Sequence, residues 1–244
     1  MGELIAVLSG KGGTGKTSIC AGVSTALARD GFDVLDIDCD MGLQNLDISL
    51  GMSDSAALSF IDVCEGGYNL DQAAKHMKFE HLRFLTAPVN RSAESVDAAA
   101  FGRMLHEARE KFDYVFLDAP AGIDAGFELA ARFADRVLLV TSADPAAVRD
   151  AAKTGQCLEQ MGKTDVRLVV NRVNSRLFSN MAVTIDDVMD TAGLPLIGVV
   201  PDDQNVTLAA AFSKPLLTQT RRGAARACVS IAKRIQGQRV PLSI

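Results

Sequence analysis

The sequence predicts an α/β protein with three layers, in which a doubly wound, mostly parallel sheet carries helices on both faces. Short apolar runs rich in β-branched residues alternate with longer segments of helical periodicity, which is the pattern of βαβ units. With 244 residues, 48% of them hydrophobic, the chain can bury one large core. We therefore expect a single domain over residues 1–244.

Strands are expected where apolar residues run continuously between turn residues. In chain order they are Leu4–Leu8, Phe32–Ile37, Leu82–Thr86, Tyr114–Leu117, Val137–Thr141, Val166–Val170 and Leu196–Val199. The least regular stretch is Met41–His81. We expect a short helix and a turn there, and no second domain.

Helices are expected between these strands. They cover residues 17–29, 98–111, 125–134, 146–161, 184–192 and 205–212, and a last helix over 222–236 closes the chain. No segment approaches the roughly 18 uninterrupted apolar residues of a membrane span, and the first residues do not resemble a secretory signal. The five cysteines are isolated in sequence, so we expect reduced thiols in a cytoplasmic protein.

The strongest motif lies at the first strand-to-helix junction. It has the sequence GKGGTGKT and satisfies GxxxxGK[ST] in the strand–loop–helix context that this pattern requires. The glycines let backbone N–H groups converge on phosphate oxygens, Lys16 suits the β- and γ-phosphates, and the Thr17 hydroxyl suits Mg²⁺. A glycine-rich turn without a ligand is the disfavoured alternative. The residues expected to hold the nucleotide here are Gly10, Lys11, Gly12, Gly13, Thr14, Gly15, Lys16, Thr17 and Ser18.

A second lysine, Lys11, directly follows the first glycine of the loop, and spacing alone leaves it equally well explained as a solvated side chain. With this lysine the loop resembles the deviant Walker A motif of the MinD/ParA family, which are P-loop ATPases of the SIMIBI class. The resemblance implies a P-loop NTPase fold, Mg²⁺-dependent ATP hydrolysis and an ATP-dependent homodimer. It also implies that Lys11 crosses the dimer interface to the partner's phosphates, so that Lys11 and Lys16 are both catalytic.

Aspartates gather at the end of the second strand, in the segment DIDCDMGLQNLD. The carboxyl ends of strands form the edge where open α/β sheets bind ligands, and Mg²⁺ with a triphosphate needs acceptors for its water. We expect Asp38 at the metal and Asp40 in catalysis. An acidic strand-to-loop junction is the alternative, which the similarity to the MinD segment disfavours. Asp36 stands where that family usually has an apolar residue, so we place it at an exposed strand edge and give it no catalytic role.

The strand Tyr114–Leu117 ends at Asp118 and continues as a flexible APAG turn. This arrangement suits an aspartate that holds Mg²⁺ through water, with Gly122 sensing the γ-phosphate through its backbone. A helix-capping aspartate is the alternative. The segment DAPAGID is similar to switch II of the same family. We therefore expect Asp118 to be both catalytic and metal-binding.

Two later strand ends are candidates for the purine site. Asn171 offers an amide donor and acceptor to adenine edges, although without the family resemblance it would be an ordinary loop residue. The residues expected at the base are Asn171, Arg172, Pro201 and Asp203. The segment SADPAAVRDAAKT is similar to a family helix that contributes dimer contacts, with a solvated helix start as the alternative. Its candidate interface residues are Asp144, Val148, Arg149 and Asp150.

The charge of the chain is unevenly distributed. The formal net charge is −5, yet seven lysines and arginines and no acidic residue follow Asp203. The last helix carries Arg222, Arg226 and Lys233 on one side and small or medium apolar residues on the other, without Trp or Phe to anchor it in a bilayer. We favour a core-packed helix with a basic outer face. A lipid surface, DNA and an acidic protein would each suit that face.

The leading hypothesis is a MinD-like ATPase that acts as a dimerisation switch in spatial regulation, at the division site or the flagellar pole, with an activating protein partner. A ParA-like ATPase that binds DNA is the alternative, and a metabolic kinase or ligase is less favoured because no acceptor site is evident. Iron–sulfur relatives are set aside because the cysteines form no CxxC pair. Peripheral contact with the inner face of the cell membrane stays open.

Overall fold

The computed structural model describes residues 1–89, 91–174 and 184–242. Within these ranges an eight-stranded sheet has the order β3-β4-β2-β5-β1-β6-β7-β8. Its strands are β1 (Glu3–Leu8), β2 (Val34–Asp38), β3 (Ala74–Lys75), β4 (Leu82–Leu85), β5 (Tyr114–Asp118), β6 (Arg136–Ser142), β7 (Val166–Val173) and β8 (Leu196–Pro201). Neighbouring strands are parallel, except that the two-residue β3 pairs antiparallel with β4.

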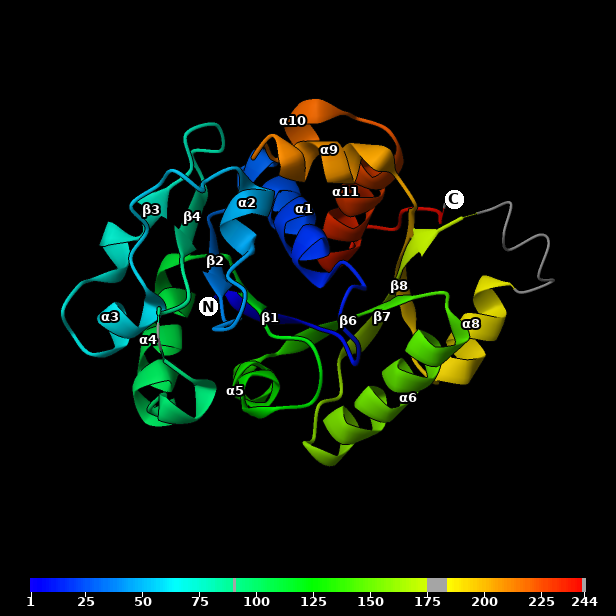
Figure 1. Ribbon diagram of the computed structural model, residues 1–244, viewed down its shortest axis with the longest axis horizontal. Coiled ribbons are helices and arrows are strands. Elements are labelled where there is room, and N and C mark those ends of the chain that lie inside the picture. Colours follow the sequence, from blue (N-terminus) through cyan, green and yellow to red (C-terminus); the bar gives the residue numbers. More distant parts are fainter. Residues whose placement is uncertain (90, 175–183, 243–244) are drawn as a thin grey trace.

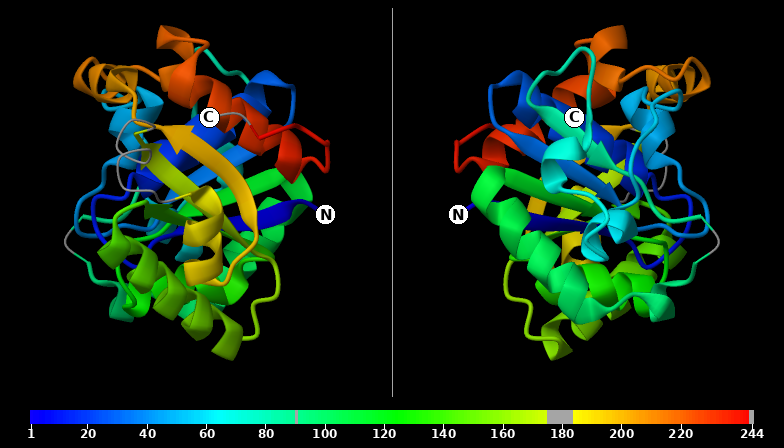
Figure 2. Two further views of the ribbon diagram at one scale, coloured as in Figure 1. Left: turned by 90° about the vertical axis from the view of Figure 1, so that its right-hand side faces the viewer. Right: turned by 90° about the vertical axis from the view of Figure 1, so that its left-hand side faces the viewer.

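Helices cover both faces of this sheet, which confirms the predicted fold class (Figure 1). The first layer holds α1 (Lys16–Arg29), α2 (Leu46–Leu50), α9 (Gln204–Ala211), α10 (Leu216–Gln219) and α11 (Gly223–Ile235). The second holds α3 (Phe60–Cys64), α4 (Ala98–Lys111), α5 (Ala125–Phe133), α6 (Pro145–Gln160) and α8 (Ile185–Ala192). The short 3₁₀ turns η1 (Leu70–Gln72) and η2 (Ala93–Ser95) lie in connections. Figure 2 shows the two helical layers on opposite sides of the twisted sheet.

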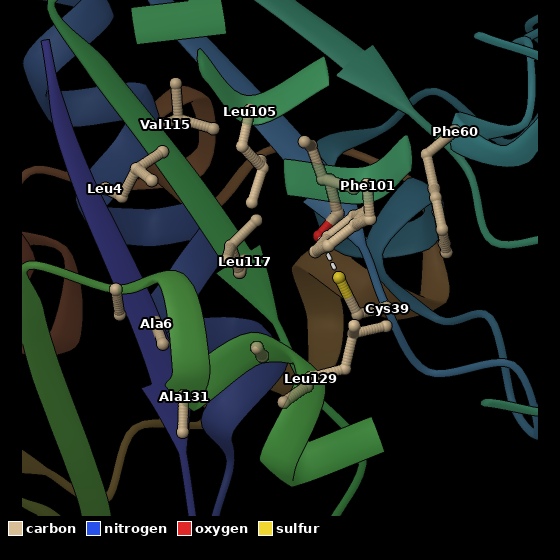
Figure 3. Close-up of a cluster of buried hydrophobic side chains, with 14 of the residues drawn as sticks. Leu4, Ala6, Cys39, Phe60, Phe101, Leu105, Val115, Leu117, Leu129 and Ala131 are labelled. Atoms are coloured by element: carbon tan, nitrogen blue, oxygen red, sulfur yellow. Dashed lines mark hydrogen bonds between the residues drawn. The ribbon is translucent and has the colours of Figure 1, made fainter. Parts of the chain in front are cut away.

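The alternation of side chains along each strand places buried clusters on both faces of the sheet. In β1, Leu4 and Ala6 belong to one buried cluster, and Ile5 and Val7 belong to the other. Successive strand residues point to opposite faces, so a continuous apolar strand supplies both cores at once. Figure 3 shows the first cluster, in which side chains of β1 and β5 meet side chains from α4 and α5. This is why the strands could be found from apolar runs alone.

The predicted strands and helices are all present, and their ends differ from the predicted ones by no more than three residues. The short helix expected within Met41–His81 is α3, whereas α2, α10 and β3 were not predicted. Each of these three elements has five residues or fewer, which is too short to show a periodicity. No helix in the described ranges is long and apolar enough to cross a membrane.

The order of the strands positions a crevice at the end of β1. From β1 the chain passes over β5 to reach β2, whereas from β5 it passes over β1 to reach β6. Connections that diverge in this way leave a gap at the carboxyl ends of the strands, where open α/β sheets bind ligands. The ends of β1, β2 and β5 therefore meet at one place.

Candidate functional site

The loop between β1 and α1 has a backbone that suits phosphate binding. Gly13 and Gly15 have φ angles of 79° and 87°, a left-handed conformation that strains any residue with a side chain. A Cβ on Gly15 would collide with the Asn171 amide, and a Cβ on Gly10 would collide with α6. The space around a Cβ on Gly13 is open to 4 Å. The loop amides and the N-terminus of α1 can therefore receive an anion.

The predicted catalytic lysine and the predicted magnesium ligands are brought together below this loop. Lys16 is only 7% exposed, and its Nζ lies 3.9 Å from Oδ1 of Asp118 at the end of β5. Burial raises the pKa of Asp118 to about 6, while the Lys16 ammonium and the Thr17 hydroxyl lower it. Oδ1 of Asp118 and the hydroxyl of Thr14 are buried and have no hydrogen-bond partner within the described residues. Such orphaned oxygens fit Mg²⁺ with its water shell and a phosphate group.

Asp38 and Asp40 shape the loop that follows β2. Asp38 lies in register with Asp118 on the neighbouring strand. Burial and the charge of Asp118 raise the pKa of Asp38 to about 7, although hydrogen bonds from the Asp40 and Leu46 amides lower it. Asp40 is half-buried and accepts a hydrogen bond from the Leu43 amide at 3.2 Å. Both predicted carboxylates therefore stand at the crevice and organise the loop beside it.

Asp36 is not at an exposed strand edge, and that expectation was wrong. It lies in the middle of the sheet, between β4 and β5, and has no exposed surface. Ser24 of α1 donates its hydroxyl to Oδ2 of Asp36 at 2.6 Å, whereas Oδ1 has no partner within the described residues. Burial raises the pKa of this carboxyl well above its usual range, despite the Ser24 hydrogen bond. A neutral carboxyl with one hydroxyl partner tolerates a dry environment that a carboxylate would not.

The loop after β5 is tied to the phosphate loop. The Gly122 amide donates to the Ser9 carbonyl at 3.0 Å, and Gly122 has a φ of 100°. The Ser9 hydroxyl in turn donates to the Lys11 carbonyl at 3.0 Å. The predicted contact between the Gly122 amide and a γ-phosphate therefore requires the amide to exchange its present acceptor, which is a movement of this loop.

A cavity of about 360 Å³ opens beside the phosphate loop, a volume that suits a nucleoside. The four residues predicted at the base all line it: Asn171, Arg172, Pro201 and Asp203. The Asn171 side-chain amide donates to the Thr14 carbonyl at 2.8 Å, so it also holds the phosphate loop. Two lining residues of α11, Ala224 and Cys228, were not predicted from the sequence. Their only sequence signal is that of a packed helix face.

Lys11 lies apart from the buried cluster. Its Nζ is 3.8 Å from the Asp144 carboxylate, and about half of each side chain is exposed. Asp144 also caps α6, and hydrogen bonding to the Ala147 amide, with a smaller effect of Lys11, lowers its pKa. Water screens such an exposed pair, so it holds Lys11 only weakly.

The other predicted interface residues are in different environments. Arg149 is exposed and Asp150 is half-buried, but Val148 is only 4% exposed and packs with Leu168 in the core under α6. The expectation for Val148 was therefore wrong. Its neighbour in sequence is at the surface, and a helix buries one face and exposes the other.

Comparisons of the sequence and of the structure with known proteins all find similar proteins of one nucleotide-binding family. The family model "CobQ/CobB/MinD/ParA nucleotide binding domain" matches residues 5–216. The septum site-determining protein MinD of Bacillus subtilis is 37% identical, across 100% of this chain and 92% of its own length. The MinC:MinD cell division complex of Aquifex aeolicus matches with a TM-score of 0.92 and 31% identity, covering 99% of this chain and 98% of that one. MinD of Pyrococcus horikoshii, complexed with Mg-ADP, matches with a TM-score of 0.84 and 27% identity over 96% of each chain.

Proposed function

The chain belongs to the CobQ/CobB/MinD/ParA family of nucleotide-binding proteins, and on this premise we propose that it is a switch in which bound ATP joins two copies of the chain. It is a MinD-like, Mg²⁺-dependent ATPase of division-site placement. One observation carries the dimer proposal. Lys11, the additional lysine of the phosphate loop, is exposed and weakly held by Asp144 instead of pointing to the buried cluster around Lys16. A cation in that position is available to a second copy.

The roles of the buried residues follow from their positions. We assign the phosphates to the loop amides and to the Lys16 ammonium, which already lies beside Asp118. When bound, Mg²⁺ neutralises phosphate charge and orders water. The residues suited to hold it are the Thr17 hydroxyl, Asp118 and Asp38. Asp40, on the loop beside the crevice, is assigned the orientation of the attacking water.

The role of Lys11 completes the proposal. Breaking its contact with Asp144 costs little because that pair is exposed. Phosphate oxygens of a partner's nucleotide are the stronger acceptors, because a triphosphate carries more negative charge than the Asp144 carboxylate and dimerisation closes the site to water. Lys11 would thus stabilise the charge that develops on the partner's triphosphate during hydrolysis.

Light scattering at saturating Mg·ATP tests the dimer. Asp40→Ala protein is expected to bind ATP, to hydrolyse it slowly and to accumulate as a dimer. Adding Lys11→Ala to that variant is expected to return it to the monomer while nucleotide binding persists. Lys78→Ala serves as the control, because Lys78 is an exposed lysine on the connection between β3 and β4. Asp40→Ala protein that stays monomeric with ATP bound would refute the switch.

The partner and the location belong to the same proposal. One relative was solved in complex with MinC, and we infer that the ATP-bound dimer of this chain also receives a protein partner that activates it. All five cysteines are free thiols, in keeping with a cytoplasmic location. A partition role would show itself differently, because ATP-bound protein would then be retained on DNA and released steeply by salt.

A further inference from the structure

The first two turns of α11 form one wall of the base pocket, through Ala224 and Cys228. The first amides of a helix have no partner within the helix and need an acceptor from outside. The N-cap residue of α11, Arg222, makes no side-chain capping hydrogen bond, and the first turn holds no acidic residue. The acceptor comes from elsewhere, because Oδ2 of Asp203 receives the Ala224 amide at 3.0 Å.

The same carboxylate also caps α9. Oδ1 of Asp203 accepts from the backbone amide and the side-chain amide of Asn205, at 2.9 and 2.7 Å. Partial burial would raise the pKa of Asp203, but the hydrogen bonds from Asn205 and Ala224 lower it below its usual value. One ionised side chain thus joins the positive ends of two helices at the edge of the base pocket. Figure 1 shows α9 and α11 in the same layer above the sheet.

The local sequence makes α11 depend on this contact. Gly223 has a φ of 55°, and a Cβ there would collide with Oδ2 of Asp203, so the close approach requires glycine. Arg221 and Arg222 precede the helix and Arg226 lies in its first turns, where the helix dipole disfavours positive charge. No acidic residue follows Asp203 in the chain. The carboxylate that caps the start of α11 is therefore supplied by Asp203, at the edge of the base pocket.

We propose that Asp203 is a positioning residue that couples the nucleotide base to the basic N-terminal end of α11. The inference rests on the proposed function, because it takes the cavity as the base site. Both oxygens of Asp203 already accept hydrogen bonds from Asn205 and Ala224. Asp203 therefore acts on the base through the pocket wall that it fastens. By reciprocity, a base in the cavity holds the first turn of α11, and a formed turn strengthens base binding.

A matched pair of variants tests this coupling. Asp203→Ala removes the double cap, whereas Asp190→Ala changes an exposed carboxylate on α8, outside the lining of this cavity. Competition against a fluorescent ATP analogue gives affinities for Mg·ATP and for Mg·tripolyphosphate, which has no base. Asp203→Ala is expected to weaken ATP binding about 3- to 30-fold, the range of one or two helix caps. Tripolyphosphate binding should stay within about twofold, and Asp190→Ala should change neither affinity.

Hydrogen exchange of the wild-type protein gives a second readout, independent of any variant. ATP is expected to slow exchange at the Ala224 amide and along the first turn of α11, and tripolyphosphate is not. If Asp203→Ala fails to fold, Asp203→Asn replaces it, since asparagine keeps one accepting oxygen and the capping ability. An intermediate loss of ATP affinity is expected for that variant.

Different outcomes contradict the coupling through Asp203 and the proposed nucleotide function. The coupling is overturned if Asp203→Ala protein binds ATP as tightly as the wild type, or if its affinities for ATP and for tripolyphosphate fall equally. It is also overturned if tripolyphosphate, without a base, slows hydrogen exchange in the first turn of α11. Wild-type protein that binds neither ligand contradicts the proposed nucleotide function instead.

Discussion

Replacing Asp36 by valine should make the nucleotide-free protein more stable. Asp36 is fully buried between β4 and β5, and one of its carboxyl oxygens has no partner within the described residues. Removal of a buried oxygen that has no hydrogen-bond partner raises the free energy of unfolding by about 1–3 kcal/mol. Burial of the two methyl groups of valine stabilises the folded state by about 1 kcal/mol, and strain from tight packing destabilises it by a comparable amount. We expect a net gain of about 1–3 kcal/mol, which raises the melting temperature about 2–4 °C per kcal/mol.

A double-mutant cycle with Ser24 shows whether the gain comes from this site. Ser24→Ala alone removes the hydrogen bond to Oδ2 of Asp36 and should cost about 1–3 kcal/mol, because both oxygens are then unpaired. In the Asp36→Val background the same change should cost much less. The Ser24 hydroxyl keeps the Ala21 carbonyl as an acceptor there. Urea unfolding without nucleotide or Mg²⁺ gives the four free energies that the cycle needs.

This reasoning is refuted if Asp36→Val protein has a lower free energy of unfolding than the wild type, while the slope of that free energy against urea concentration is the same in both proteins. Asp36 would then contribute a favourable interaction that its single hydrogen bond does not explain. ATP turnover is a separate readout. It should persist in Asp36→Val protein, because no role in the reaction is assigned to this carboxyl.

Two further predictions concern other buried contacts. His76 is buried, bonds through Nε2 to the Leu50 carbonyl at 2.8 Å, and has its pKa lowered by burial. The folded state prefers the neutral ring, so its stabilising contribution is complete above the unfolded pKa of about 6.5 and is lost as the pH falls through the lower folded pKa. The urea midpoint of His76→Asn protein should therefore fall less than the wild-type midpoint between pH 7.5 and 5. Equal changes of the midpoint in the two proteins would contradict this. The second prediction concerns Gly22, where an added Cβ would lie 2.6 Å from the Cys228 Sγ. Gly22→Ala should lower the free energy of unfolding by about 1–3 kcal/mol through overpacking, and adding Cys228→Ala should restore most of that loss in thermal melts. Losses of stability that simply add in the double variant would contradict the contact.

Features that depend on neighbouring residues in the sequence could be predicted. The strand before Gly10, the glycines of the loop and the helix after Lys16 form one continuous segment, so the pattern alone indicated the geometry that the structure shows. The same holds for Asp118, which is the last residue of an otherwise apolar strand. The roles of all these residues in binding and hydrolysis stay predictions that the proposed variants test.

Features that depend on distant residues could not be predicted in this way. Nothing near Asp36 in the sequence indicates that Ser24 of α1 will donate to it. Likewise, nothing near Asp203 indicates that the amide of Ala224 will bond to its carboxylate. Val148 was misplaced for a related reason, since the strands that cover it come later in the chain. Burial and capping partners are decided by the packing of whole elements, which local periodicity does not specify.

The aspartates near the strand ends show how packing distributes roles among identical side chains. Asp203 receives backbone amides from two helices, its pKa falls, and it fastens a wall of the base pocket. Asp38 also receives backbone amides, but burial beside Asp118 outweighs them, so its pKa rises to about 7. Asp36 has a single hydroxyl donor and one oxygen without a partner in the described residues, and burial raises its pKa well above the usual range. Because burial favours the neutral acid and amide donors favour the charged form, the balance between burial and donors decides which carboxylate is a structural anchor, which suits a metal and which destabilises the fold.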